Sequence, residues 1–483
     1  MHWPRFFSYV APLCARTAKL VASAPTASVS KLSKLSVGLT MGALAFGLAG
    51  CGGHEARTLR MRTALDEGNP KEAITAIDEE LEVRAAKDLP SEVVGDNALL
   101  VLDRASIQQS LLSFEDSKRD FQAADKAIEM LDLSKSSIDS IGKWIFSDSS
   151  GRYVAPPHEK LLVNALNILN YLETGDLGGA KVEARRLSVM TRYLHDVMKE
   201  TDNAMLALGG VLAGFAFEKS GETDEALRYY DEALAFGGYA SLGPAVKDLL
   251  GRGNYKSPRL VTLAQGQPEP KPEDADLGDV LIVMGHGRVP HKIAERLPIG
   301  LALTFAAGHI HPGDVAAANK LALQGLVTWV NFPSLAPGQG AYATPVAQVD
   351  GAYVELVQVV DVSHEVRRAW ERIKGQVIAS AITRTVARFA AGSAVGAVGS
   401  AAGGKNGDII GTLLSLGTQA ALTAADTPDT RSWETLPARV VFARMRLPAG
   451  RHTISLTARG WSRRQEIQLE KGSFKVVSLM ALN

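Results

Sequence analysis

The chain has 483 residues, of which 46% are hydrophobic and 22% are charged, and its 52 lysines and arginines balance its 52 aspartates and glutamates. This composition is that of a globular protein with about two or three domains. A net charge of zero gives no bulk attraction for nucleic acid, so we expect no nucleic-acid partner.

A basic and then apolar stretch near the N-terminus is typical of an export signal. Lys31 and Lys34 precede an apolar run over residues 37–48, which is shorter than the roughly 20 residues of a spanning helix. The run leads into Leu48-Ala49-Gly50-Cys51, which resembles the lipobox of bacterial lipoproteins. That resemblance implies cleavage before Cys51 and a lipid on its sulfur. An ordinary N-terminal membrane anchor that contains a cysteine is the alternative.

The lipoprotein interpretation makes residues 1–50 a signal peptide and Cys51 the first residue of the exported chain. Cys14, the other cysteine, is then discarded, so no thiol remains for a disulfide, a zinc site or a nucleophile. Gly52 and Gly53 follow the cysteine and no aspartate does. By resemblance to proteobacterial lipoproteins, this implies attachment to the outer membrane on its periplasmic side.

Helical periodicity extends from residue 58 to about residue 250, where apolar residues recur at three and four positions and proline is scarce. Four self-similar pieces lie between apolar helical stretches, at residues 68–73, 112–117, 175–180 and 221–226. A glycine in such a piece can end one helix in a left-handed conformation, and a polar residue after it can cap the next helix. The pieces therefore predict pairs of helices joined by tight turns.

These pairs resemble the tetratricopeptide repeat. The residues at the small and aromatic packing positions of that family are Gly68, Ala73, Ala105, Phe121, Gly175, Ala180, Gly221, Ala226 and Tyr230. The second copy lacks the glycine, and the copies lie farther apart than the 34 residues of a regular array. The resemblance implies a degenerate TPR-like α-solenoid over residues 51–262, and an unrelated helical bundle is the alternative.

A proline-rich stretch at residues 263–278 predicts an extended, semi-rigid spacer between two separable halves. Beyond it the period shifts toward two, which predicts a strand at 279–284, a turn at 285–290 and a returning strand at 291–297. Further strands are predicted at 327–332, 353–360, 439–446, 452–458, 464–469 and 474–479. This β-rich, sandwich-like domain occupies residues 279–362 and 431–483. Its end, from Leu447 to the last strand, resembles the β-sandwich repeat called PEGA.

A helical insertion at residues 363–425 interrupts the β-rich domain. Its first part, Ser363–Arg388, is amphipathic, with Val366, Trp370, Ile373, Val377 and Ala381 on one face. Its second part, Phe389–Ala425, is rich in Ala and Gly and contains G-x-x-x-G pairs, which favour close helix packing. We expect it to pack as a helical hairpin on the β-rich module or in an oligomer interface, with membrane insertion as the alternative. The predicted fold class is α+β.

The whole pattern resembles a family of uncharacterised bacterial lipoproteins. The residues that carry this resemblance are Val182–Arg186, Leu297–Gly300 and Arg431–Pro437. The resemblance implies the architecture and supplies no activity.

No motif identifies a catalytic site. Gly399–Asn406 approaches a P-loop, but Asn406 replaces the metal-binding hydroxyl residue and no strand precedes it. His286, His291, His309 and His311 form the densest group of histidines, although glycines and prolines around them favour ordinary turn residues.

We expect a non-enzymatic cell-envelope lipoprotein, without metal or cofactor, whose concave helical face holds a protein partner as a scaffold for an envelope complex. A metal-dependent enzyme that uses the four histidines and a membrane-inserting assembly component remain as alternatives.

Overall fold

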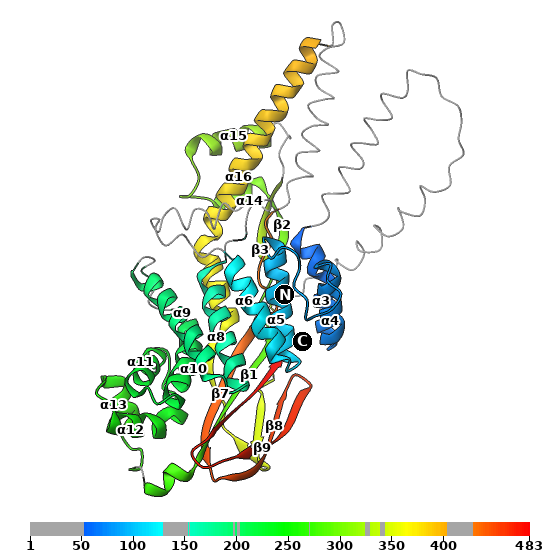
Figure 1. The fold of residues 1–483 in the computed structure, drawn as a ribbon. Coiled ribbons are helices and arrows are strands. Elements are labelled where there is room, and N and C mark those ends of the chain that lie inside the picture. The colour runs from blue at the N-terminus through cyan, green and yellow to red at the C-terminus, as the bar shows by residue number, and fades with distance from the viewer. Residues whose placement is uncertain are drawn as a thin grey trace. The chain divides into compact units, whose positions relative to one another are not determined.

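Helical hairpins occupy the first part of the described chain and strands occupy most of the second, so the fold is α+β (Figure 1). The computed structural model describes residues 53–128, 153, 155–196, 199, 203–269, 271–323, 329–338, 343–402 and 428–483; for residues 388–402 and Pro157 only the backbone is described. The helical hairpins are α3 (His54–Asp66) with α4 (Pro70–Glu80), α5 (Asp96–Ser110) with α6 (Phe114–Ala127), α8 (Pro157–Glu173) with α9 (Leu177–Asp196), α10 (Met205–Lys219) with α11 (Thr223–Ala233), and α12 (Gly243–Arg252) with α13 (Pro258–Ala264). Each hairpin also contacts the next one along the chain.

The turns inside the first four hairpins are the four self-similar pieces of the sequence. Three turns have a glycine with positive φ: +74° at Gly68, +75° at Gly175 and +80° at Gly221. In the turn between α5 and α6, Leu112 takes the equivalent position with φ +63°. The piece that lacks the glycine therefore keeps the left-handed turn and places a leucine in it.

The strands form three sheets. They are β1 (Gly278–Arg288), β2 (Lys292–Pro298), β3 (Trp329–Leu335), β4 (Val346–Val349), β5 (Ala352–Val354), β6 (Val357–Asp361), β7 (Pro437–Leu447), β8 (Gly450–Ala458), β9 (Trp461–Leu469) and β10 (Phe474–Ala481). The first sheet has the order β10-β1-β7-β6, the second β5-β4-β8-β9, and β2 pairs with β3 alone. Within the first sheet β1 runs parallel to β10 and antiparallel to β7.

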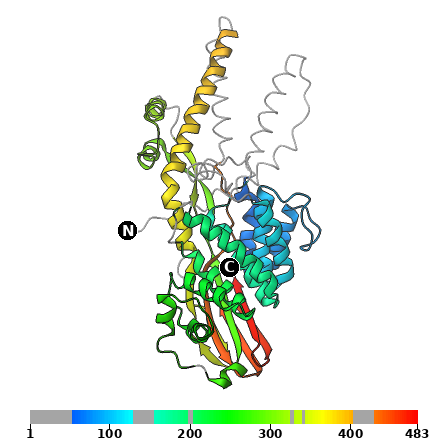
Figure 2. The same ribbon diagram turned by 60° about the vertical axis from the view of Figure 1, so that its left-hand side comes forward.

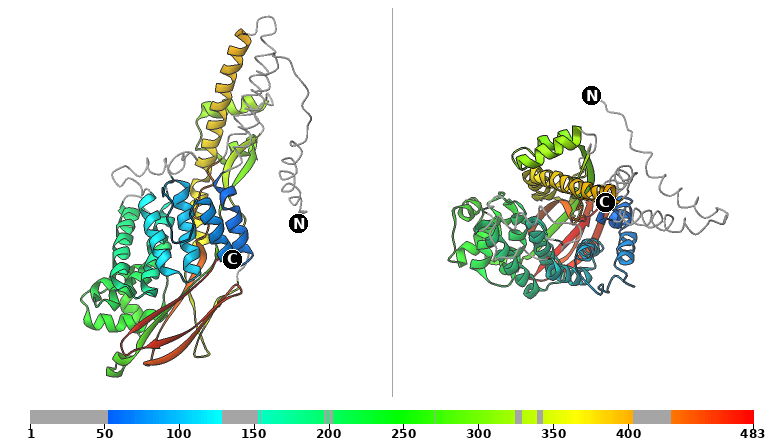
Figure 3. Two further views of the ribbon diagram at one scale, coloured as in Figure 1. Left: turned by 45° about the vertical axis from the view of Figure 1, so that its right-hand side comes forward. Right: turned by 90° about the horizontal axis from the view of Figure 1, so that it is seen from above.

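The first sheet is a middle layer, and β1 shows this best because it is buried on both faces. Val280, Ile282 and Met284 share a core with the second sheet. Leu281 and Val283 alternate with them and share a core with the helices. The helical hairpins therefore lie on one side of the first sheet and the second sheet packs on the other (Figures 2 and 3).

Several predicted strands are confirmed, but the hairpin predicted after residue 279 is wrong. Strand β1 continues through Gly285 to Arg288, and β2 pairs with β3 instead. A Cβ atom on Gly285 would lie 2.5 Å from the Met480 sulfur and 2.9 Å from Pro437, so this glycine permits close strand packing and makes no turn. The predicted strand at 353–360 is divided into β5 and β6.

The two halves are not separated by the proline-rich stretch as expected. Residues 52–483 form one compact unit, and a single hydrophobic core contains residues of both the hairpins and the first sheet. Part of the predicted spacer, Pro272–Asp276, is a 3-10 helix that leads directly into β1. The physical reason is that the sheet supplies the apolar surface on which the hairpins pack.

Helix α16 (Val362–Ala402) has 41 residues and therefore a length of about 60 Å. Helices α14 (Ile299–Phe305) and α15 (Pro312–Leu323) and strand β3 pack on it (Figure 1). The apolar face predicted for residues 363–388 is confirmed where α16 meets these elements, because Trp370, Val377 and Ala381 are buried in the core that they share.

Candidate functional site

The structure places the predicted repeat residues at turns and helix contacts. Gly68, Gly175 and Gly221 lie in the turns. The others are completely buried: Ala73, Ala105, Phe121, Ala180, Ala226 and Tyr230. Small residues are needed at these positions because the two helices of a hairpin approach closely. In the second copy, Ser117 at the equivalent position donates a hydrogen bond of 2.7 Å to the Ala105 carbonyl of the other helix.

One face of the hairpins packs against the first sheet of the same chain; the sequence predicted a partner on a concave helical face but did not fix which helix face that is. The first helices of the hairpins, α5, α8 and α10, contact strands β10 or β6 of the first sheet. In α10 every residue from Met205 to Phe217 is buried. That face is therefore a core and is not available to another protein.

The segment Arg431–Pro437, which turns at Glu434 and Thr435, lies against helices α5 and α8. Its main chain donates hydrogen bonds from Trp433 to Glu159 of α8 (3.0 Å), and from Glu434 and Thr435 to Asp103 of α5 (3.1 and 3.0 Å). The indole of Trp433 is 1% exposed and packs edge-on against Phe121 at a ring distance of 5.7 Å. The segment thus joins the β-rich half to the hairpins.

Two carboxyl groups are buried where this segment meets the helices. Arg62 of α3 donates a hydrogen bond of 2.7 Å to Glu434. Burial, and secondarily the neighbouring Glu434, raises the pKa of Asp103 well above its usual range. Burial also raises the pKa of Glu434, although Arg62 opposes this shift. The pair therefore favours holding a proton in the folded state.

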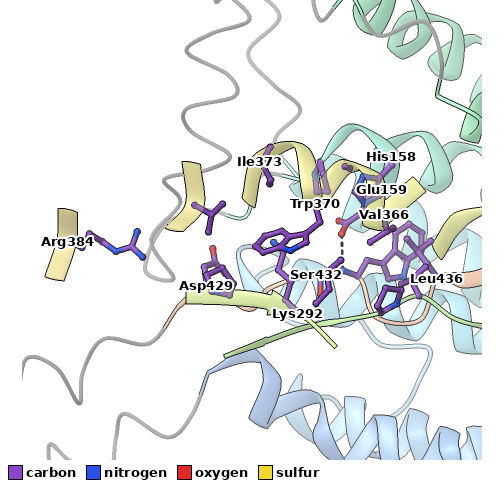
Figure 4. Close-up of a pocket in the computed structure, with 18 residues that line it drawn as sticks. His158, Glu159, Lys292, Val366, Trp370, Ile373, Arg384, Asp429, Ser432 and Leu436 are labelled. Atoms are coloured by element: carbon purple, nitrogen blue, oxygen red, sulfur yellow. Dashed lines mark hydrogen bonds between the residues drawn. The ribbon is translucent and has the colours of Figure 1, made fainter. Parts of the chain in front are cut away.

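An apolar groove opens beside this segment, with an empty volume of about 840 Å³, part of it solvent (Figure 4). We call it the α16 groove. Its apolar lining comes from one stripe of α16, from β3, from the turn after β1 and from the 431–437 segment: Val366, Ala369, Trp370, Ile373, Val377, Pro333, Leu335, Val289, Pro290, Trp433 and Leu436.

Polar groups line the same groove. Burial and the nearby Lys292 lower the pKa of His158 to about 3, so its imidazole is neutral at pH 7. Burial raises the pKa of Glu159, although its hydrogen bonds with Tyr153 and Trp433 oppose the shift. Figure 4 shows Arg384 and Asp429 toward one end of the groove and His158 and Glu159 toward the other.

A second pocket, the arginine pocket, shares Val289 and Pro290 with the α16 groove and has an empty volume of about 900 Å³. The charged groups that line it are Arg62, Arg288, Arg367, Arg439, Asp66, Asp361 and Glu434. Three of the arginines pair with these carboxylates: Arg62 with Glu434, Arg288 with Asp66 and Arg439 with Asp361. Most of the charge in this pocket is therefore already neutralised within the protein.

The four predicted histidines lie on different elements. His286 is buried on β1, where burial and Arg439 lower its pKa to about 4. His291 lines the arginine pocket, and burial with Arg62 and Arg288 lowers its pKa to about 4. His309 and His311 are exposed around the turn between α14 and α15. In the described ranges, no group of three or more His, Cys, Asp or Glu side chains could hold a metal ion.

Several predicted features lie wholly or partly outside the described residues. Cys51 and the second arm of the Ala/Gly-rich hairpin are among them. Residues 399–402 of the P-loop-like stretch belong to helix α16, and the remainder is outside. Among the helices that are described, none is both long and apolar enough to cross a membrane.

Comparisons of the chain with family models, with characterised proteins and with solved structures find no match. The site must therefore be interpreted from its own geometry.

Sequence reasoning missed the α16 groove and the role of Trp433. The apolar stripe on α16 was visible as helical periodicity, but periodicity does not show which part of a stripe packs and which part lines a cavity. In the sequence, the 431–437 segment was singled out only by its resemblance to a family of bacterial lipoproteins.

Proposed function

We propose that this chain is a non-enzymatic, lipid-anchored scaffold of the cell envelope, and that its hairpins are degenerate tetratricopeptide-type repeats. The lipobox-like Leu48–Cys51 supports export and attachment to the outer membrane on its periplasmic side. The recurrence of a left-handed turn followed by a buried small residue supports the repeat assignment.

The observation that carries the binding role is the way in which the hairpins hold the 431–437 segment. Arg62, Asp103 and Glu159, one residue from the first helix of each of the first three hairpins, hydrogen-bond to it. The helical layer thus holds this internal segment through main-chain bonds to Asp103 and Glu159 and through the Glu434 side chain, which pairs with Arg62. A separate protein partner then needs a different surface.

We assign the partner surface to the outer side of α9, which we call the α9 stripe. Val182, Arg185, Val189 and Arg192 are spaced by three or four residues, so they lie on one helix face, and all four are exposed. The two valines are 47% and 45% exposed. Apolar side chains interleaved with arginines suit a partner segment that is itself apolar and acidic.

A photo-crosslinking amino acid placed at Val189 tests this surface in intact cells, with the same group at Tyr353 as the control. Tyr353 lies on β5 and is 78% exposed. We expect one discrete crosslinked product from position 189 and not from position 353. The double variant Arg185→Glu/Arg192→Glu should abolish it, whereas Lys320→Glu should not. The same product from both positions, or none from position 189, contradicts the proposal.

The lipid anchor has its own test. A Cys51→Ala chain should accumulate unprocessed and without an acyl label, because the sulfur that would carry the lipid is gone. A mature N-terminus at any residue other than Cys51 would show that the lipobox interpretation is wrong.

A further inference from the structure

The α16 groove combines apolar walls with an imbalance of charge. Trp370, Ile373 and Val377 on α16 and Leu335 on β3 contribute to its apolar lining. From Val366 to Arg384, α16 covers about 27 Å, so a groove that follows this helix is elongated. An elongated apolar cavity favours a ligand with a long apolar part, because each apolar group buried in it leaves water.

Both carboxyl groups that line the groove are already satisfied. Asp429 accepts hydrogen bonds of 2.8 and 2.7 Å from the Arg431 guanidinium. Glu159 accepts a hydrogen bond of 2.6 Å from the Tyr153 hydroxyl and one of 3.0 Å from the Trp433 main chain. Neither acid therefore needs a cation from the lining.

The two positively charged side chains that line the groove, in contrast, have no such partner among the described residues. Lys292 and Arg384 line the groove, and neither forms an ion pair with any residue that the structure describes. Lys292 influences the pKa values of His158 and Glu159, so its ammonium lies near them, whereas Arg384 is at the opposite side of Figure 4. The groove thus offers positive charge beside apolar walls.

We propose that the α16 groove binds a single acyl chain that carries an anionic head group. The chain lies along the apolar stripe of α16, and the carboxylate or phosphate of the head pairs with Lys292 or Arg384. The positive charges of Lys292 and Arg384 would repel a ligand with a cationic head group. A small inorganic anion would pair with these charges but would not contact the apolar walls. The shared chemistry is a long-chain anion, whether it comes from a free fatty acid or from a lysophospholipid.

Titration of a chain that begins at Gly52 with palmitate tests the inference, since residues 52–483 form one compact unit and lack the lipid site. Hexadecanol serves as the uncharged probe of equal length, and palmitoyl lysophosphatidic acid serves as the phosphate probe. We expect one palmitate per chain and at least tenfold weaker binding of hexadecanol. Tighter binding of the lysophosphatidic acid than of palmitate indicates a lysophospholipid source, and the reverse indicates a free acid.

Matched variants locate the site. Lys292→Gln/Arg384→Gln should weaken palmitate binding at least tenfold and leave hexadecanol binding unchanged. Ile373→Trp should weaken both by filling the groove. Lys374→Gln is the control, because Lys374 is on the same helix, pairs with Glu371 and does not line the groove. Thermal melting by circular dichroism confirms that each variant is folded.

Binding of none of the three probes, equal binding of palmitate and hexadecanol, or an equal loss in the Lys374→Gln control would overturn the proposal. These outcomes are independent of the α9 stripe, which the crosslinking experiment tests separately.

Discussion

Leu112 holds a backbone conformation that glycine holds in the three equivalent turns. Its φ is +63° and its side chain is 40% exposed, so the leucine gains little burial in return for the strain. The left-handed conformation costs an L-residue about 1–2 kcal/mol, whereas glycine costs about 0.5–1 kcal/mol in extra chain entropy. Leu112→Gly should therefore raise the free energy of unfolding by about 0.5 kcal/mol, measured by urea denaturation.

The reverse change is the control for this prediction. Gly221 has φ +80°, and a Cβ atom there would meet no other atom within 4 Å, so a larger residue adds only backbone strain. Gly221→Leu should lower the free energy of unfolding by about 1–2 kcal/mol. If both substitutions change stability in the same direction, the turns are not equivalent.

Asp103 predicts a pH dependence whose sign can be worked out. Burial, followed by Glu434, raises its pKa in the folded state, so the folded protein holds the proton more tightly than the unfolded chain. The stability that Asp103 contributes to the fold is complete below its usual pKa of 3.8. This stability is lost as pH rises toward the higher pKa of the folded state. Asp103→Asn removes this loss and keeps the oxygen that accepts the main-chain hydrogen bonds.

Relative to the wild type, Asp103→Asn should therefore gain stability as pH rises from 5 to 8, with a slope of at most about 1.4 kcal/mol per pH unit, in urea denaturation at each pH. Asp276→Asn is the control, since this carboxylate is exposed and its pair with Lys471 is worth little. A constant difference between Asp103→Asn and the wild type across this range would show that Asp103 is charged in the fold.

At the scale of elements, a buried ion cluster connects helix α10 to the first sheet. Arg444 of β7 donates hydrogen bonds to Glu218 of α10 (2.6 and 2.7 Å) and to Asp279 of β1 (3.0 Å). Burial alone would raise the pKa of Glu218, but Arg444 and Lys219 lower it well below the usual range. This stabilisation is present above the usual carboxyl pKa and is lost as pH falls.

Arg444→Met should lower the free energy of unfolding by about 3–5 kcal/mol at pH 7, because it leaves two buried carboxylates without their main partner. The loss should shrink as the buffer is acidified. Lys471→Met, which removes an exposed pair with Asp276, should change stability by less than about 1 kcal/mol. Equal effects of the two substitutions in thermal melting would contradict the role assigned to the cluster.

Helix packing inside a hairpin gives a second prediction at this scale. Ala226 of α11 is completely buried, and elsewhere in the same hairpin a Cβ atom on Gly210 of α10 would lie 2.9 Å from the Tyr229 carbonyl of α11. Helices this close leave no room for a larger side chain. Ala226→Leu should destabilise the protein by about 1–3 kcal/mol in urea denaturation. No change in stability would mean that the hairpin can open without cost.

The sequence predicted most elements because their periodicity is local. The four turns, the amphipathic part of α16 and the strands β7 to β10 follow from such patterns. The pairing of β1 did not follow, since Gly285-His286-Gly287 has the composition of a turn although it lies in a central strand. A glycine needed for close packing and a glycine needed for a turn look the same in one sequence.

At the scale of the whole molecule, the layering could not be predicted. The apolar sequence of strand β1 predicts that both of its faces are buried. It does not show that helices cover one face and a second sheet covers the other. The candidate site could not be predicted for the same reason. His158, Lys292, Trp370 and Ser432 come from four distant parts of the chain and meet only because the hairpins, the sheet and α16 pack together.

This layering gives a last prediction, which concerns cleavage of the chain between its two halves. Gln265, Gly266, Pro268 and Glu269 are exposed, so a protease should cut there first. The two fragments share one hydrophobic core, the Arg444 cluster and the 431–437 segment. They should therefore elute together in size-exclusion chromatography and separate only in denaturant. Residues 52–264 expressed alone should aggregate, because the face that normally contacts the sheet becomes exposed. A soluble helical fragment that elutes by itself after cleavage would instead mean that the sheet is not required by the hairpins.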